Sequence, residues 1–182
     1  LLRAHGLLVK RRKYRPATTN SNHLYRKYPN IVRDLELVRA GLLWASDITY
    51  LRTGHGFVYL SLVTDAYSKK IVGWCLWPSL ASAGALKALR MAVETEGAKE
   101  GLIHHSDRGI QYCCTDYVAF LQGQKIGISM TENGDPYENA VAERVNGILK
   151  GEYGLADTFS NYLEANEAVK SAIDKYNNHR PH

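Results

Sequence analysis

Three segments between residues 43 and 77 constrain the fold most, because each is dense in the β-branched and aromatic residues typical of strands. They read LWASDITYL at 43–51, FVYLSLVTD at 57–65 and KKIVGWCLW at 69–77. Only two short connections, residues 52–56 and 66–68, separate them. A parallel pair needs a crossover of about a dozen residues or more, so the pattern predicts three consecutive antiparallel strands.

The remaining chain alternates helical and strand patterns. Apolar spacing predicts helices at 82–97, 115–124, 135–152 and 162–177, with Gly97 stopping the first, and short apolar runs predict strands at 102–106 and 126–130. This order predicts an α/β fold of mixed topology. The longest apolar runs are too short to span a bilayer, so we expect a soluble protein without a membrane partner.

The charge is divided unevenly along the 182 residues. Residues 1–40 hold ten Lys or Arg against two acids, a net +8, whereas residues 41–182 hold 13 against 16, a net −3. We therefore expect a basic arm at 1–40 and a separate folded core at 41–182. The arm fits a nucleic-acid backbone through Lys10, Arg11, Arg12, Lys13 and Arg15. A merely soluble linker is the alternative. Because the chain does not begin with Met, we also expect a preceding region.

Cysteine usage indicates a reducing compartment, and hence the cytoplasm. The three cysteines, Cys75, Cys113 and Cys114, are an odd number without the spacing of a disulfide framework. A zinc site from the two adjacent histidines His104 and His105 with Cys113 and Cys114 is a weaker alternative, because neighbouring strand residues point to opposite faces.

Two aspartates lie where a carboxylate needs an explanation. Asp47 sits inside the first apolar strand, where its charge is costly unless it is paired or holds a metal ion. Asp107 comes just after the fourth strand, in HHSDRGIQY, where Gly109 lets the chain turn sharply. Asp65 ends the second strand and could either bond locally in a turn or support the other acids.

The helix at 135–152 carries three glutamates with different expected roles. Asp135, Pro136 and Glu138 form a helix-start signature, and Glu152 lies at the frayed end. On a helical wheel, Glu143 shares one face with Asn139, Asn146 and Lys150, opposite an apolar stripe of Val141, Val145 and Ile148. For this helix alone, an ordinary solvated face is the simpler interpretation of Glu143. If Glu143 meets Asp47 and Asp107, the three carboxylates repel one another and favour a hard divalent cation, Mg²⁺ or Mn²⁺.

Several motifs together resemble a known family. WASDITYL, TDAYSKKIVGW, HHSDRGIQY, SMTENGDPYENAVAERVNGILKGE and YNNHRPH resemble, in order and spacing, the catalytic core of bacterial insertion-sequence transposases of the DDE type, related to retroviral integrases. The gap of 35 residues between Asp107 and Glu143, with Lys150 seven residues further on, is the most specific feature. Arg144-Val145-Asn146 departs from relatives that often carry aromatic residues there.

The resemblance implies a ribonuclease-H-like fold, a mixed five-stranded sheet flanked by helices. It implies a transposase in which Asp47, Asp107 and Glu143 are catalytic and hold two Mg²⁺ ions, with Mn²⁺ as a substitute. Lys150 and Asn146 would contact the DNA end, in a multimer assembled on element and target DNA without a small-molecule substrate. A nuclease of the same fold that cannot join strands, and a DNA-binding remnant that has lost catalysis, are the alternatives.

Overall fold

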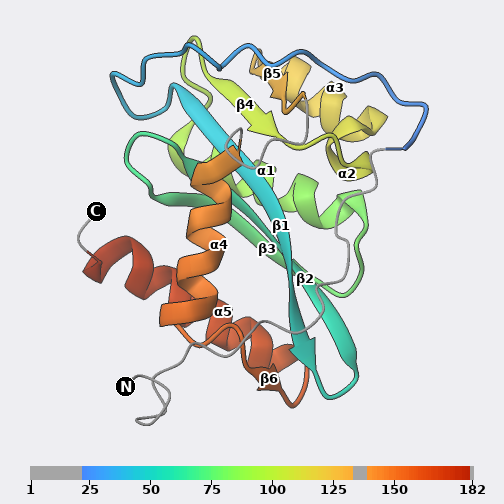
Figure 1. Cartoon of the computed structure of the whole chain (residues 1–182), viewed down its shortest axis with the longest axis vertical. Helices are drawn as coiled ribbons and strands as arrows, with labels where there is room; N and C mark the ends of the chain where they lie inside the picture. The colour runs from blue at the N-terminus through green and yellow to red at the C-terminus, as the bar shows by residue number, and fades with distance from the viewer. Residues whose placement is uncertain (1–21, 133–138, 181–182) are drawn as a thin grey trace, which may run out of the picture.

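A computed structural model of the chain describes residues 22–132 and 139–180. Its centre is one mixed sheet with the strand order β3-β2-β1-β4-β5 (Figure 1). These strands are β1 (Leu43–Thr53), β2 (Gly56–Asp65), β3 (Ile71–Trp77), β4 (Ile103–Ser106) and β5 (Gly127–Met130). The first three are antiparallel, as predicted, whereas β4 pairs parallel to β1 and β5 parallel to β4.

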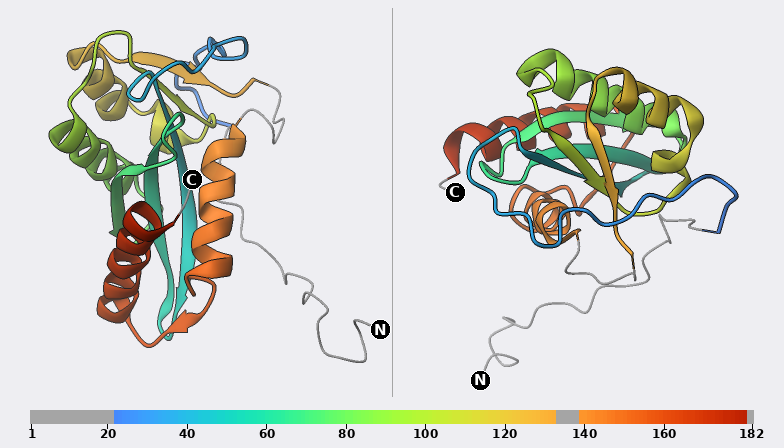
Figure 2. Two further views of the ribbon diagram at one scale, coloured as in Figure 1. Left: turned by 90° about the vertical axis from the view of Figure 1, so that its left-hand side faces the viewer. Right: turned by 90° about the horizontal axis from the view of Figure 1, so that it is seen from above.

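Helices cover both faces of the sheet, which gives three layers (Figure 2). The helices are α1 (Ser82–Glu96), α2 (Ile110–Cys113), α3 (Thr115–Gly123), α4 (Ala140–Glu152) and α5 (Tyr162–His179). One core lies between the sheet and α1, α2 and α3, and a second lies between the sheet and α4 and α5. Because strand side chains alternate between faces, Leu62 enters the second core and its neighbour Val63 enters the first.

The predicted α/β class of mixed topology is confirmed, and the differences are short elements. Helix α2 is a single turn, and β6 (Thr158–Phe159) adds two residues that pair parallel to β1. Neither is long enough to show a periodic pattern in sequence. Strand β3 begins two residues later than predicted because Lys69 adopts a positive φ of 64° in the preceding turn. The predicted helix start at Asp135 to Glu138 lies outside the described residues.

The described part of the basic arm runs along the β5 edge of the sheet (Figure 1). The backbone N–H of Met130 donates to the carbonyl of Pro29 at 3.3 Å, and the N–H of Ile31 donates to Oγ of Ser129 at 3.1 Å. These contacts join the arm to the core, and the division at residue 40 stays a prediction. Within residues 22–132 and 139–180, no helix has the length and apolar character needed to cross a membrane.

Candidate active site

Asp47 lies in the middle of β1, beside α4. Its Oδ2 accepts a hydrogen bond of 2.7 Å from Nδ2 of Asn146, and its Oδ1 accepts one of 2.8 Å from the backbone N–H of Ile48. Burial, followed by the negative charge of Asp107, raises the pKa of Asp47 to about 7, although both hydrogen bonds oppose the shift. The fold therefore holds this carboxyl where its ionised form is disfavoured, as expected for an acid inside an apolar strand.

Asp107 follows β4 immediately and comes next to Asp47. In the parallel pairing of β1 and β4, Ala45 is opposite His105. Asp47 and Asp107 each come two residues after this pair, and Asp107 lies just beyond the end of β4. Oδ1 of Asp107 accepts a hydrogen bond of 2.8 Å from the N–H of Gly109. The negative charge of Asp107 raises the pKa of Asp47, so the two predicted aspartates lie within electrostatic range of each other, beside the end of β4.

Gly109 suits its position for a different reason from the one predicted. Its φ of −63° and ψ of 146° are available to any residue, so no sharp turn demands a glycine here. A Cβ at this position would instead lie 2.9 Å from both Oδ1 of Asp107 and Oε1 of Gln111. The missing side chain leaves room for the Asp107 carboxylate to bend back onto the backbone.

Helix α4 turns a different face to the sheet from the predicted one. Its buried residues are Ala142, Val145, Asn146 and Leu149, whereas Val141 and Ile148 are only partly buried. With 100° per residue, the buried arc is centred about 80° from the predicted apolar stripe. Glu143 is exposed, as predicted, and its charge adds to burial and to Asp107 in raising the pKa of Asp47. It therefore lies at the rim of the aspartate pair.

The two asparagines of α4 attach the helix to β1. The helical wheel predicts them on the solvent-facing side, but Asn139 is 8% exposed and Asn146 is 7% exposed. Nδ2 of Asn139 donates to the carbonyl of Ser46 at 3.0 Å, and Nδ2 of Asn146 donates to the next residue, Asp47. The observed partner of Asn146 is thus a catalytic candidate, and its predicted DNA contact stays untested. In the sequence, the seven-residue spacing of Asn139 and Asn146, which puts both amides on one helical face, was the signal for their bonds to β1.

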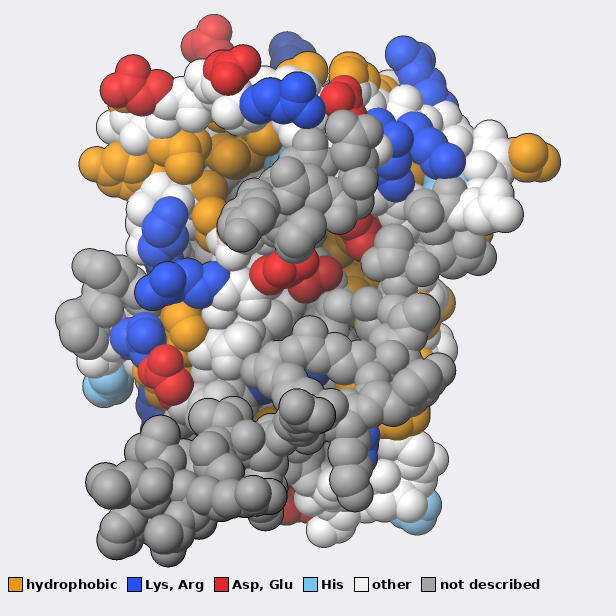
Figure 3. Space-filling view, in the orientation of Figure 1, with side chains coloured by type: hydrophobic (Ala, Val, Ile, Leu, Met, Phe, Trp, Pro, Cys, Tyr) orange, Lys and Arg blue, Asp and Glu red, His pale blue; other side chains and the backbone are white. Residues whose placement is uncertain are grey.

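Lys150 lies at the far end of α4, against the strand that carries Asp47. Its Nζ is 4.4 Å from the ring centroid of Tyr50, a cation–π contact, and the Tyr50 ring packs edge-on against Phe57. Acidic side chains gather near the middle of this face of the molecule, with Lys and Arg side chains on both sides (Figure 3). The predicted phosphate-binding cluster from Lys10 to Arg15 lies outside the described residues.

The described residues offer a divalent cation two carboxylates rather than a preformed site with three ligands. Among the described residues, no three His, Cys, Asp or Glu side chains lie close enough together to hold a metal ion. Glu143 thus does not complete a ready-made cage, and the alternative zinc set with Cys113 and Cys114 is not assembled either. Asp47 and Asp107 nevertheless supply only oxygen donors, and burial together with their mutual repulsion raises the pKa of Asp47, which suits Mg²⁺ or Mn²⁺.

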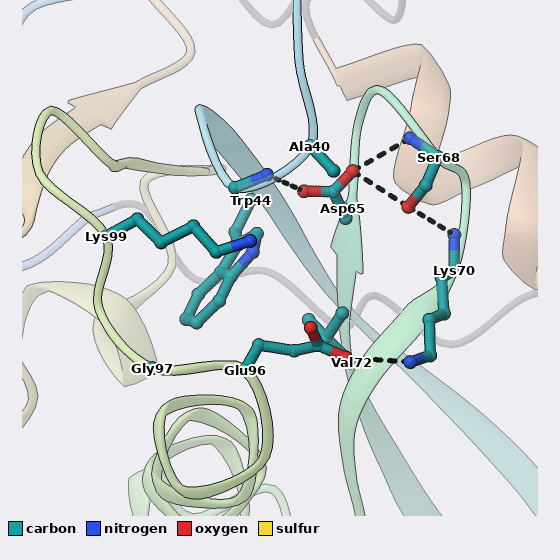
Figure 4. Close-up of a pocket in the computed structure, with 10 residues that line it drawn as sticks. Ala40, Trp44, Asp65, Ser68, Lys70, Val72, Glu96, Gly97 and Lys99 are labelled. Carbon is teal, nitrogen blue, oxygen red and sulfur yellow. Dashed lines mark hydrogen bonds and ion pairs between the residues drawn. The ribbon is translucent and has the colours of Figure 1, made fainter.

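Asp65 has a local structural role. Its buried carboxylate accepts hydrogen bonds from the N–H of Gly41 at 2.6 Å and from the N–H and Oγ of Ser68 at 2.8 and 2.9 Å. It lies on a small pocket near the ion pair between Lys70 and Glu96 (Figure 4). The pocket volume of ≈ 30 Å³ is room for about one water molecule, not a nucleotide. Asp65 therefore ties the start of β1 to the turn after β2.

The sheet order, the helices on both faces and the aspartate pair define a ribonuclease-H-like α/β domain of the kind found in integrase catalytic cores. The HTLV-2 integrase catalytic core in complex with magnesium (trimeric form) matches with a TM-score of 0.64 at 18% identity, over 80% of this chain and 90% of that one. Two models described as integrase core domain match residues 38–136 and 124–182. The chain belongs to the integrase core domain family.

Curated relatives from Shigella sonnei resemble nearly the whole chain. The insertion element IS600 uncharacterized 31 kDa protein is 37% identical over 174 residues, which cover 94% of this chain and 64% of that protein. The transposase for insertion sequence element IS629 is 32% identical over 180 residues, which cover 99% of this chain and 60% of that protein. The chain thus spans less than two thirds of the length of either relative.

Proposed function

We propose that the chain is the catalytic part of a DNA transposase, which cleaves the ends of a mobile element and joins them to new DNA. The observation that carries the proposal is the electrostatic proximity of three carboxylates, because the charges of Asp107 and Glu143 both raise the pKa of Asp47. Family membership and the likeness to a named insertion-sequence transposase support it. Strand cleavage and joining are one reaction with two nucleophiles, water and a 3′-OH.

We further propose that Asp47 and Asp107 hold Mg²⁺ or Mn²⁺, and that Glu143 completes a second ion site when DNA is bound. Two bound ions supply activation of the attacking oxygen and stabilisation of the leaving 3′ oxygen. The HTLV-2 integrase core, whose structure is a complex with magnesium, supports the choice of metal. Glu143 is exposed, so a change of rotamer can bring its carboxylate towards the pair without unpacking α4.

The protein side chains have separate tasks in this mechanism. Asp47 must be ionised to hold a cation, and a pKa of about 7 leaves a large part of it protonated at neutral pH until the cation displaces the proton. Asn146 donates to Oδ2 of Asp47 and so fixes the plane of the carboxylate. Lys150, whose Nζ lies over the Tyr50 ring, would contact a DNA phosphate near the cleavage point.

The partners in this proposal are the element ends and the target DNA. Two ends must be brought together, so we expect a multimer assembled on DNA, and the trimeric form of the HTLV-2 integrase core is consistent with assembly in this family. The basic residues Lys10 to Arg15 would hold phosphates without reading sequence. The place of action would be the bacterial cytoplasm, on the nucleoid.

The test uses labelled duplexes that carry the terminal sequences of the element encoding the chain, with Mg²⁺ or Mn²⁺. We expect shortened strands and joined products, and both should be lost in Asp107→Asn. Shortened strands without joined products would favour the nuclease. Binding without either product, in wild type and variant alike, would favour the inactive DNA-binding remnant. Unchanged cleavage by Asp107→Asn would show that the assigned site is wrong.

A further inference from the structure

A short segment of the arm, residues 23–28, leads from the turn after Asp107 towards β5 at the edge of the sheet (Figure 1). We call this segment the strap. Nε2 of His23 lies 2.9 Å from the carbonyl oxygen of Arg108, so the ring N–H donates to the residue that follows Asp107. At the other end of the strap, the partly buried ring of Tyr28 packs against the core on the α1 side of the sheet. Both ends of the strap are therefore attached to the core.

The residues that follow the strap add a second attachment, on β5. The N–H of Ile31 donates to Oγ of Ser129 at 3.1 Å. The same Oγ lies 2.9 Å from Nδ1 of His105, which is buried on β4 two residues before Asp107. The arm is thus joined to the stretch of chain around Asp107 from both sides, and its position relative to that carboxylate is fixed.

The middle of the strap is exposed and basic. Leu24, Tyr25, Arg26 and Lys27 are all exposed to solvent. Residues 22–33 contain three Arg or Lys and no Asp or Glu. Cations without acids beside them in the chain attract a polyanion, and the nearest one in a DNA-cleaving protein is the DNA backbone. A linker that only spans two parts of a protein needs such charges for solubility, but it does not need the attachments beside Asp107.

We propose that the strap binds the backbone of the DNA strand that enters the candidate active site, with Arg26 and Lys27 contacting the phosphates next to the cleaved bond. This inference rests on the proposed function. Contacts to phosphates fix the register and orientation of a protein on DNA. Because the strap is attached to the turn after Asp107, its phosphate contacts hold one strand in place relative to the aspartates.

The first test removes the two charges in Arg26→Gln/Lys27→Gln. Binding of the full chain to a labelled element-end duplex is measured without metal over a range of salt concentrations, and cleavage is measured in Mn²⁺. Each phosphate contact contributes about 0.9 to the slope of log affinity against log salt concentration. We expect the variant to lose about 1.8 from this slope, and to bind at least about tenfold more weakly in about 0.1 M salt. Cleavage at low protein concentration should fall by a similar factor.

The matched control is Lys170→Gln/Lys175→Gln, which removes the same two charges from exposed positions on α5. This variant should keep the wild-type salt slope and cleavage rate. It separates contacts made by the strap from the general attraction between a basic protein and DNA.

The second test asks where the strap meets the DNA. A photoreactive residue, p-benzoylphenylalanine, replaces Leu24 in the strap, and in the control it replaces Leu163 near the start of α5; both leucines are exposed. We expect the substitution at Leu24 to crosslink to nucleotides next to the cleaved bond, and the one at Leu163 to give no crosslink there.

The outcomes separate the two proposals. If wild type cleaves the duplex and the strap variant keeps its salt slope and rate, the inference is overturned while the function stands. Equal losses in the two double variants, or crosslinks from Leu24 only far from the cleaved bond, also overturn it. If wild type binds the duplex without cleaving it, the proposed function fails, while a reduced slope in the strap variant still supports DNA binding by the strap. A wild-type chain that does not bind the duplex overturns both.

Discussion

Removing the Asn146 amide should make Asp47 harder to ionise. In Asn146→Ala, the carboxylate loses a hydrogen bond of 2.7 Å that favours its charged form. Hydrogen bonds to charged groups contribute about 1.5–3 kcal/mol, and one pKa unit corresponds to about 1.36 kcal/mol. Water will replace part of the lost bond, so we expect the pKa of Asp47 to rise by about one unit from its wild-type value of about 7.

The measurement is the carboxyl ¹³C shift of Asp47 followed by NMR through a pH titration of the metal-free protein. The same change should appear in function, with the acidic limb of the cleavage rate in Mn²⁺ moved to higher pH by about one unit. A general weakening of α4 could imitate the loss of activity but not this movement of the pKa.

Asn139→Ala is the matched control. Asn139 makes the same kind of bond from the same helix, at 3.0 Å, but to the carbonyl of Ser46 instead of a carboxylate. It should lower the free energy of unfolding by about 1–3 kcal/mol and leave the pKa of Asp47 in place. The reasoning is refuted if the two variants move the pKa equally, or if Asn146→Ala leaves it unchanged.

Three further predictions follow from burial and close contacts. The folded state binds a proton on Asp47 up to a pH of about 7 and the unfolded state only to about 3.8, so metal-free stability falls as pH rises between these values. Asp47→Asn should therefore be more stable than wild type at pH 8, by at most about 4 kcal/mol. Chemical unfolding at several pH values should show this gain vanish near pH 4. Gly109→Ala places a Cβ 2.9 Å from Oδ1 of Asp107, so the cleavage rate should fall about tenfold while stability is nearly kept. Its control is Gly123→Ala in α3, where the added Cβ meets open space, and this variant should raise the free energy of unfolding by about 0.5–1 kcal/mol. Gly73→Ala places a Cβ 2.1 Å from a backbone carbonyl of α1, and should cost about 3 kcal/mol or more in urea unfolding; normal stability would show that β3 and α1 do not pack this closely.

Most of the fold could be predicted from the sequence because the strongest sequence patterns depend on neighbouring residues. Runs of β-branched and aromatic residues with short turns favour an antiparallel meander, and Gly97 stops α1 where predicted, with a φ of 72° and its N–H on the carbonyl of Val93. Elements of one turn or two residues, α2 and β6, have no period to detect. They form because the sheet and the turn after Asp107 are already in place.

The site was predictable only where the local sequence around a single residue indicates its role. A carboxylate inside an apolar strand and another just after a strand pointed to Asp47 and Asp107 without knowledge of the register that pairs them. The orientation of α4 was not predictable in this way, because the wheel weighs apolar side chains and Asn146 counts against burial. It is buried because Asp47 offers it a partner, and that partner is 99 residues away in the chain.

Local rules of stability are broken repeatedly in one small region, where β4 ends beside β1, which is paired with β2 along nearly its whole length. There the fold accepts a half-buried aspartate close to a second one and a glycine that makes room for a carboxylate. Each feature alone has a more stable replacement, such as Asn or Ala, that keeps the fold. Under the proposed function their coincidence is expected, because a sequence can maintain a metal site at the expense of stability.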